Sequence, residues 1–294
     1  MKSPSLISLH GGHSGEFCCH ARDRLEEIIC AYIKKGFKRV GITEHIPPVS
    51  DLLRFPDEIE QGLTARDLYQ RFARYMTEVK RLKAVYQSEI RIHAGMETET
   101  CTGYLPHVKQ LIQAFKPDYI VGSVHHVDDI CFDYSRQEYD RAVRHCGSHE
   151  QMYLRYFDLQ FEMINNLQPF VVGHFDLIRI HDQELYEQRL LSPVIQKKML
   201  RNLHRIKALG LIMDFNLRPL SRGEKEPYLT PSLLKMIKTL GIPVVPGDDS
   251  HGQDQAGGHV AHAIEILETL GFDTRWPEPK LLPPNNEKPL KDIE

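Results

Sequence analysis

Three features are missing from this 294-residue sequence: a long apolar run, an excess of one charge and a pattern of paired cysteines. No apolar stretch approaches the ~18 residues of a spanning helix, and no basic segment precedes an apolar one near the start, so we expect neither a membrane anchor nor a secretory signal. The formal net charge is only −3, which argues against a nucleic-acid or membrane-surface partner. The oligomeric state stays open.

The six cysteines are scattered and form neither a disulfide framework nor a CxxC motif. Cysteines scattered in this way are usually reduced thiols, and we therefore expect a cytoplasmic protein. Even the adjacent pair Cys18 and Cys19 is expected to pack near other groups rather than to bind metal.

What the sequence does contain is a regular alternation of short apolar runs and amphipathic segments. The runs predict seven strands, at 5–10, 38–45, 90–99, 118–127, 169–176, 211–216 and 243–251. Helical patterns lie between or after them, at 22–36, 65–87, 104–116, 149–166, 192–209, 231–240 and 258–270. This alternation predicts an α/β fold with a parallel sheet, either doubly wound or closed into a barrel.

A single domain is expected over residues 1–275, followed by an extended, proline-rich and charged tail over 276–294. The segment 47–63 contains three prolines and is expected to be a long loop after the second strand.

Polar side chains follow the carboxyl end of all seven predicted strands. They are His10, Glu44, His45, Glu97, Glu99, His125, His126, His174, Asp176, Asn216, Asp248, Asp249 and His251. That edge is where active sites of β/α barrels and open α/β sheets are built. Singly, each has an ordinary explanation: a lone histidine is usually a hydrogen-bonding residue, Glu99 a surface acid and Asp176 a loop cap. Their joint placement predicts one site.

The donor set of this site narrows its chemistry. Many of the sixteen histidines and a few carboxylates take part, and the opening stretch LHGGHSGEFCCH adds His10, His13 and His20. Imidazoles with carboxylates suit zinc, manganese or iron rather than calcium, and there are too many donors for one ion. Two or three closely spaced ions favour hydrolysis of phosphate esters, because they activate water near neutral pH and neutralise charge in the transition state.

Five motifs follow one another in the chain: TEH at 43–45, GME at 95–97, GSVHHV at 122–127, GHFDL at 173–177 and DDSH at 248–251. In these motifs, and over about residues 7–270, the chain resembles the PHP (polymerase and histidinol phosphatase) superfamily of metallohydrolases, and within it the histidinol-phosphate phosphatases. The resemblance implies a distorted, TIM-like β/α barrel of seven strands. It also implies a site with up to three metal ions, commonly zinc, manganese or iron.

The resemblance implies a ligand role for nine residues: His10, His13, His20, His45, Glu97, His125, His174, Asp249 and His251. Glu97 would bridge two ions, and Asp249 would complete the shell of the first. His125 and His174 would hold the second ion together with Glu97, and the histidines at 20, 45 and 251 would hold the third.

The opening stretch departs from the family pattern, in which HxH supplies two ligands to the first ion. His13 occupies the second of these positions, but Gly11 occupies the first and His10 lies one residue early. We expect Gly11 and Gly12 to let the chain bulge, so that His10 still reaches the ion.

The activity implied by the resemblance is hydrolysis of the phosphomonoester L-histidinol phosphate to L-histidinol and phosphate, a step in histidine biosynthesis. Glu97 and Asp249 would act as metal ligands, and His126 is a candidate proton donor to the leaving group. Two alternatives remain: a PHP-type phosphoesterase acting on phosphodiesters or nucleotide phosphates, and a non-catalytic metal-binding accessory protein.

Substrate recognition is less sharply indicated. Arg218, Arg222 and Arg179 could each bind phosphate through a guanidinium fork, although surface solvation explains them equally well. An acid such as Asp133, or one within 47–63, could pair with the substrate amine.

Overall fold

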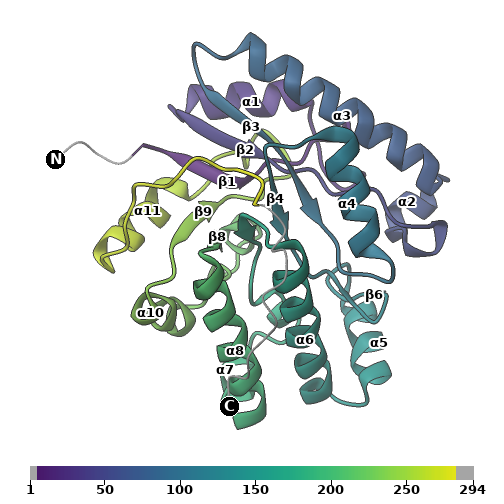
Figure 1. Ribbon diagram of the computed structural model, residues 1–294, viewed down its shortest axis with the longest axis vertical. Coiled ribbons are helices and arrows are strands. Elements are labelled where there is room, and N and C mark those ends of the chain that lie inside the picture. Colours follow the sequence, from purple (N-terminus) through teal and green to yellow (C-terminus); the bar gives the residue numbers. More distant parts are fainter. Residues whose placement is uncertain (1–4, 283–294) are drawn as a thin grey trace.

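Seven parallel strands form one sheet at the centre of the computed structural model, which describes residues 5–282 (Figure 1). In sheet order they are β1 (Ile7–Gly11), β2 (Arg39–Ile42), β3 (Arg91–Thr98), β4 (Tyr119–Gly122), β7 (Val171–Val172), β8 (Ile212–Asn216) and β9 (Val244–Gly247). The two ends of this order also meet, since the amide of Asp249 donates to the carbonyl of His10 at 2.8 Å. The sheet is therefore a nearly closed barrel, which confirms the expected β/α barrel of seven strands.

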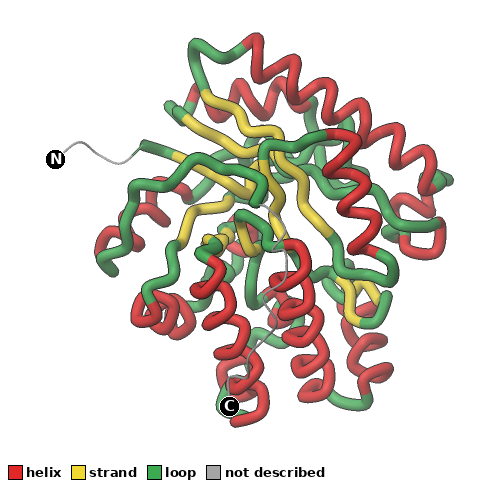
Figure 2. The backbone as a smooth tube through the Cα atoms, in the orientation of Figure 1, coloured by secondary structure: helices red, strands yellow, loops and turns green. Residues whose placement is uncertain are grey.

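Helices surround these strands (Figure 2). They are α1 (Leu25–Lys34), α2 (Pro56–Glu60), α3 (Ala65–Val85), α4 (Tyr104–Phe115), α5 (Arg136–Cys146), α6 (His149–Leu167), α7 (Tyr186–Arg189), α8 (Pro193–Leu209), α9 (Arg218–Ser221), α10 (Pro231–Leu240) and α11 (Val260–Thr269). Seven of these match predicted helices, because each carries one apolar face that packs on its neighbours. None of the helices in 5–282 is long and apolar enough to cross a bilayer.

The predicted strand 118–127 is wrong in its second half. β4 ends at Gly122, and β5 (His126–Val127) pairs antiparallel with β6 (Ile130–Cys131) in a hairpin. Asp128 and Asp129 form the turn with φ of +48° and +64°, as a tight hairpin of this hand requires. The helix α5 that follows was not predicted, and the predicted loop 47–63 contains α2 and a 3₁₀ turn at Asp51–Leu53.

Tyr119 fills the barrel interior below the carboxyl edge. Its hydroxyl donates to the carbonyl of Leu9 at 2.8 Å, across the barrel from its own strand. A Cβ on Gly41 would lie 1.8 Å from this hydroxyl oxygen, so only glycine fits there. The tyrosine thus connects β4 to β1 across the interior of the barrel.

The described part of the tail, residues 276–282, contains no helix or strand and lies at the amino ends of the strands. Trp276 is buried, and its indole N–H donates to the carbonyl of Val244 at 2.8 Å. The guanidinium of Arg39 donates to the carbonyl of Trp276, and that of Arg91 to Glu278. The rest of the predicted tail, 283–294, lies outside the described residues, and the domain boundary at 275 stays a prediction.

Candidate metal centre and active site

His10 reaches the site through an irregularity in the first strand. The register between β1 and β2 shifts between Ser8 and Gly11, and a Cβ on Gly11 would lie 2.1 Å from the carbonyl oxygen of Gly41. The ring of His10 is fully buried, with Nε2 3.3 Å from Oε1 of Glu97. The structure therefore contains the expected bulge and brings the early histidine into the cluster.

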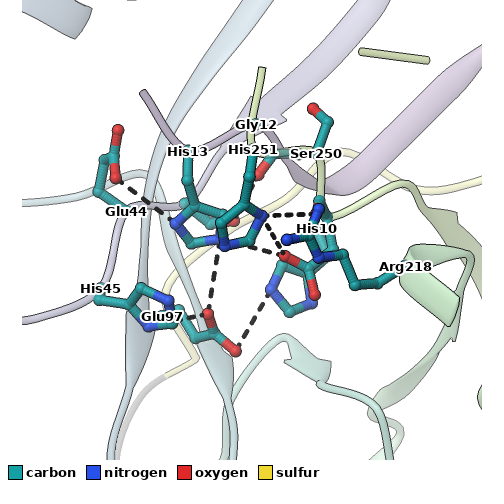
Figure 3. Close-up of polar contacts among 12 residues, drawn as sticks. His10, Gly12, His13, Glu44, His45, Glu97, Arg218, Ser250 and His251 are labelled. Carbon is teal, nitrogen blue, oxygen red and sulfur yellow. Dashed lines mark hydrogen bonds and ion pairs between the residues drawn. The ribbon is translucent and has the colours of Figure 1, made fainter. Parts of the chain in front are cut away.

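Glu97, near the end of β3, lies at the centre of the cluster (Figure 3). Its Oε1 lies 3.0–3.3 Å from ring nitrogens of three histidines, His174, His10 and His125. Its Oε2 lies 3.2 Å from a ring nitrogen of His45 and 3.7 Å from one of His13. A carboxylate whose two oxygens face separate groups of imidazoles has the geometry of a bridging ligand.

Asp249 and His251 approach from the loop after β9. Oδ1 of Asp249 is 3.3 Å from Nε2 of His13, and Oδ2 accepts a hydrogen bond from Asn216 at 3.1 Å. The His251 ring lies 4.5 Å from the ring of His13 and 5.1 Å from that of His20, between ring centroids. Both predicted residues of the DDSH motif thus lie in the cluster.

His20 lies at its rim. The side chain is 34% exposed, and Nδ1 contacts the carboxylate of Asp57 at 3.1 Å. Cys18, expected only to pack near the site, is buried and places its sulfur among three imidazoles. These four donors lie within 4.8 Å of one another: His13, Cys18, His45 and His251. No metal motif in the sequence pointed to this thiol.

A second set of carboxylates contacts Nδ1 of histidines whose Nε2 faces Glu97. The shortest contacts are His10–Asp214 at 2.7 Å, His125–Glu99 at 2.7 Å and His13–Glu44 at 3.4 Å. Such partners fix the tautomer and orientation of a metal-binding imidazole.

The sequence places Glu99 among the side chains of the predicted site without giving it a partner, and it gives Asp214 no role. Glu99 is 5% exposed and also contacts His45 and His126, which excludes the alternative reading as a surface acid. For Asp214, a charged residue inside the apolar strand β8 was a usable signal. Asp176, in contrast, accepts a hydrogen bond from the amide of Leu229 at 2.7 Å, in keeping with the reading as a loop cap.

The electrostatics of the cluster follow from its carboxylates. Burial alone would lower the pKa of His10, but Glu97, Asp249 and Asp214 raise it well above its usual value. Burial likewise opposes the carboxylates that raise the pKa of His13 to about 9. The histidines hold the pKa of Glu97 and Asp249 well below their usual range, against the effect of burial. The carboxylates are therefore ionised at neutral pH, and buried negative charge faces the imidazoles.

The residues present fit divalent metal ions. Several ring nitrogens are buried without a hydrogen bond among the described residues: Nε2 of His10, both nitrogens of His13 and Nδ1 of His45. Imidazole nitrogens and carboxylate oxygens that converge in this way are the donors that zinc, manganese and iron use in proteins.

A cavity of about 210 Å³ opens over the cluster, and Arg218 and Arg222 line it. Arg218 donates to the side chain of Gln255 at 2.7 Å, and Arg222 to the hydroxyl of Tyr228 at 3.1 Å. Arg179 is not on the cavity wall: its buried guanidinium donates to the carbonyls of residues 226 and 227. His126 also lies outside this wall, with Nδ1 3.4 Å from Glu99.

Known proteins resemble this chain along most of its length. A protein from Schizosaccharomyces pombe named "Probable histidinol-phosphatase" is 35% identical over 90% of this chain and 87% of that protein. The "Histidinol-phosphatase" of Saccharomyces cerevisiae is 27% identical, over 84% of each.

Two crystal structures share the fold. One from Listeria monocytogenes, described as a candidate histidinol phosphatase, matches with a TM-score of 0.74 and 25% identity, over 86% of this chain and 98% of that one. The other is the histidinol phosphate phosphatase of Lactococcus lactis, described as a complex with zinc, L-histidinol and phosphate. It matches with a TM-score of 0.68 and 17% identity, over 92% of this chain and 95% of that one. The PHP domain model matches residues 9–216, which is most of the chain, and together with the 35% identical relative this shows that the chain belongs to the PHP domain family.

Proposed function

We propose that this chain hydrolyses L-histidinol phosphate to L-histidinol and phosphate, the substrate named for its relatives. One observation carries the proposal: the two oxygens of Glu97 face separate groups of histidines at the floor of a cavity that Arg218 and Arg222 line. A site that holds several cations beside two guanidinium groups suits a phosphate ester.

We propose that two or three divalent ions, of zinc, manganese or iron, occupy the cluster. Glu97 would bridge the first and second ions. The other ligands would be His10, His13 and Asp249 for the first, His125 and His174 for the second, and His20, His45 and His251 for the third, with Cys18 adjacent. When bound, such ions activate water and neutralise the charge of the phosphate.

The chain's own groups would bind and orient the ester. Arg218 and Arg222 would hold the phosphate oxygens from the cavity wall, where a guanidinium fork matches their geometry. We assign no such role to Arg179, because the 226–227 carbonyls already occupy its guanidinium. We also withdraw His126 as the proton donor, because its ring lies outside the cavity wall.

The free state of all six cysteines supports a cytoplasmic location, which we propose as well. A small phosphomonoester is the only partner that this function requires.

Metal content and steady-state hydrolysis of L-histidinol phosphate by the purified protein test the proposal together. Two or three transition-metal ions per chain, with turnover that a chelator abolishes and added metal restores, are the expected result. Faster cleavage of bis(p-nitrophenyl) phosphate than of L-histidinol phosphate would instead favour a phosphodiesterase. Metal without turnover of any phosphate ester would contradict catalysis.

A further inference from the structure

One carboxylate in the cavity is left without a role by the metal centre. Three acidic side chains line this cavity: Glu97, Asp249 and Asp133. The first two face ring nitrogens of the histidine cluster. Asp133 is half-buried, and within residues 5–282 its carboxylate forms no ion pair with a lysine, arginine or histidine. No lysine, arginine or histidine nitrogen of the described residues therefore lies within 4.0 Å of this carboxylate on the cavity wall.

The segment at the end of the β5–β6 hairpin connects Asp133 to the cluster. The amide of Phe132 donates to the carbonyl of His125 at 3.1 Å, and the Phe132 side chain is fully buried. The thiol of Cys131 donates to Oδ1 of Asp133 at 3.3 Å, which leaves Oδ2 for another donor. Because His125 belongs to the cluster, the same short segment fixes both a candidate metal ligand and this carboxylate.

The charged groups of the cavity wall come from different parts of the barrel. Arg218 and Arg222 belong to α9 and its end, after β8, whereas Asp133 follows β6, and Figure 1 shows β6 and β8 well apart. The aromatic rings of Phe55 and Tyr134 line the same cavity. A ligand that matches this wall carries an anion for the arginines, a cation for Asp133 and a flat group for the rings.

L-Histidinol phosphate has these three parts, since it combines a phosphate, a primary ammonium group and an imidazole. We propose, on the basis of the proposed function, that Asp133 binds the substrate's ammonium group while Phe55 and Tyr134 flank its imidazole. Oδ2 of Asp133 accepts a charge-assisted hydrogen bond from the ammonium, and no ion pair within the described chain competes for this oxygen. Asp133 thereby selects amino-alcohol phosphates over phosphate esters that lack the amine.

The experiment compares two substrates that differ only in the amine: L-histidinol phosphate and 3-(imidazol-4-yl)propyl phosphate. In the metal-loaded wild-type protein, we expect kcat/KM to be roughly 10- to 100-fold higher for the substrate with the amine. Asp133→Asn keeps the shape of the side chain and removes its charge. The variant should lose most of this preference, while its kcat/KM for the analogue without the amine stays unchanged.

Asp140→Asn is the matched control, because Asp140 lies on α5 and pairs with Arg136 at the surface. It should keep the wild-type preference, and both variants should keep the wild-type metal content. If Asp133→Asn retained the preference for the amine, the inference would be overturned while the proposed function stood. The same holds if kcat/KM fell equally for both substrates. A wild-type protein that turns over diesters but not L-histidinol phosphate would overturn the proposed function and the inference with it.

Discussion

Glu97 is the residue on which most of the proposed chemistry depends, because its carboxylate contacts candidate ligands of all three proposed ions: His10 and His174 through Oε1, and His45 through Oε2. Around it, several candidate ligands have a carboxylate partner that fixes their orientation, such as Asp214 for His10 and Glu99 for His125. The structure thus separates residues that would touch a metal ion from residues that position those ligands. Single substitutions distinguish the two groups.

Glu97→Gln should reduce kcat by roughly 10³-fold or more, because a neutral amide bridges two cations poorly. Metal content should also fall, to fewer than two ions per chain. Elemental analysis and initial rates on L-histidinol phosphate measure both effects. Glu138→Gln is the control, because Glu138 is a partly exposed residue in the first turn of α5 that pairs with Arg141. Full activity in Glu97→Gln would contradict the assignment.

Asp214→Asn should instead lower the affinity of the site for metal, although every candidate ligand stays in the chain. The Asp214 carboxylate contacts Nδ1 of His10 at 2.7 Å, and loss of such a partner costs about 10- to 100-fold in metal affinity. Competition with a chromophoric chelator measures the affinity of the weakest ion. An affinity equal to that of wild type would show that His10 is held without its carboxylate partner.

The bulge in β1 shows how one element corrects an unusual spacing. His10 lies one residue earlier than the family pattern expects, and the register shift after Ser8 compensates for this. Gly11 makes the shift possible, because its α-carbon lies against the backbone of β2.

Gly11→Ala should therefore separate β1 from β2 and move His10. A Cβ placed 2.1 Å from a backbone carbonyl cannot be accommodated, and we expect a loss of about 2–3 kcal/mol in the free energy of unfolding together with lower metal content. Gly36→Ala is the control: nothing lies within 4 Å of its Cβ, so only its φ of +85° should cost about 1 kcal/mol, with metal content unchanged. Urea denaturation and metal analysis of both variants test this, and normal metal content in Gly11→Ala would show that the bulge is not needed.

Some of these elements were predictable and others were not. Alternating apolar runs predicted a parallel α/β sheet because each strand is buried on both faces, and the family resemblance implied its closure into a barrel. Strand-end histidines predicted the site because parallel strands share one edge. The hairpin β5–β6 was missed because two-residue strands leave no periodicity, and its only signal is the pair Asp128–Asp129. The partner of Asp214 could not be predicted either, since it lies 204 positions away in sequence.

On the scale of the whole molecule, the two ends of the barrel have different roles. Candidate metal ligands gather at the carboxyl ends of the strands, and the described part of the tail covers the amino ends. His93 lies on β3 beside this covered end, where Nε2 is 3.4 Å from Glu278.

His93 should make stability depend on pH. Burial, only partly offset by Glu278, lowers its pKa from 6.5 to about 4. Between these values the unfolded chain binds more protons than the folded one, so the free energy of unfolding falls as the pH drops from about 6.5 towards 4, by up to about 3 kcal/mol from this group. In His93→Gln this part of the pH dependence should vanish, which urea denaturation at pH 7 and pH 4.5 can measure. Identical pH dependence in both proteins would contradict it.

The position of Trp276 also determines what an optical experiment on this protein can see. It is the only tryptophan in the chain, it is buried, and its indole donates to Val244 at the first residue of β9. Its fluorescence should report the opening of the barrel base with a red shift, whereas a ligand that enters at the opposite edge should leave the emission unchanged. Intrinsic fluorescence is therefore a probe of unfolding here, and substrate occupancy needs a label placed elsewhere.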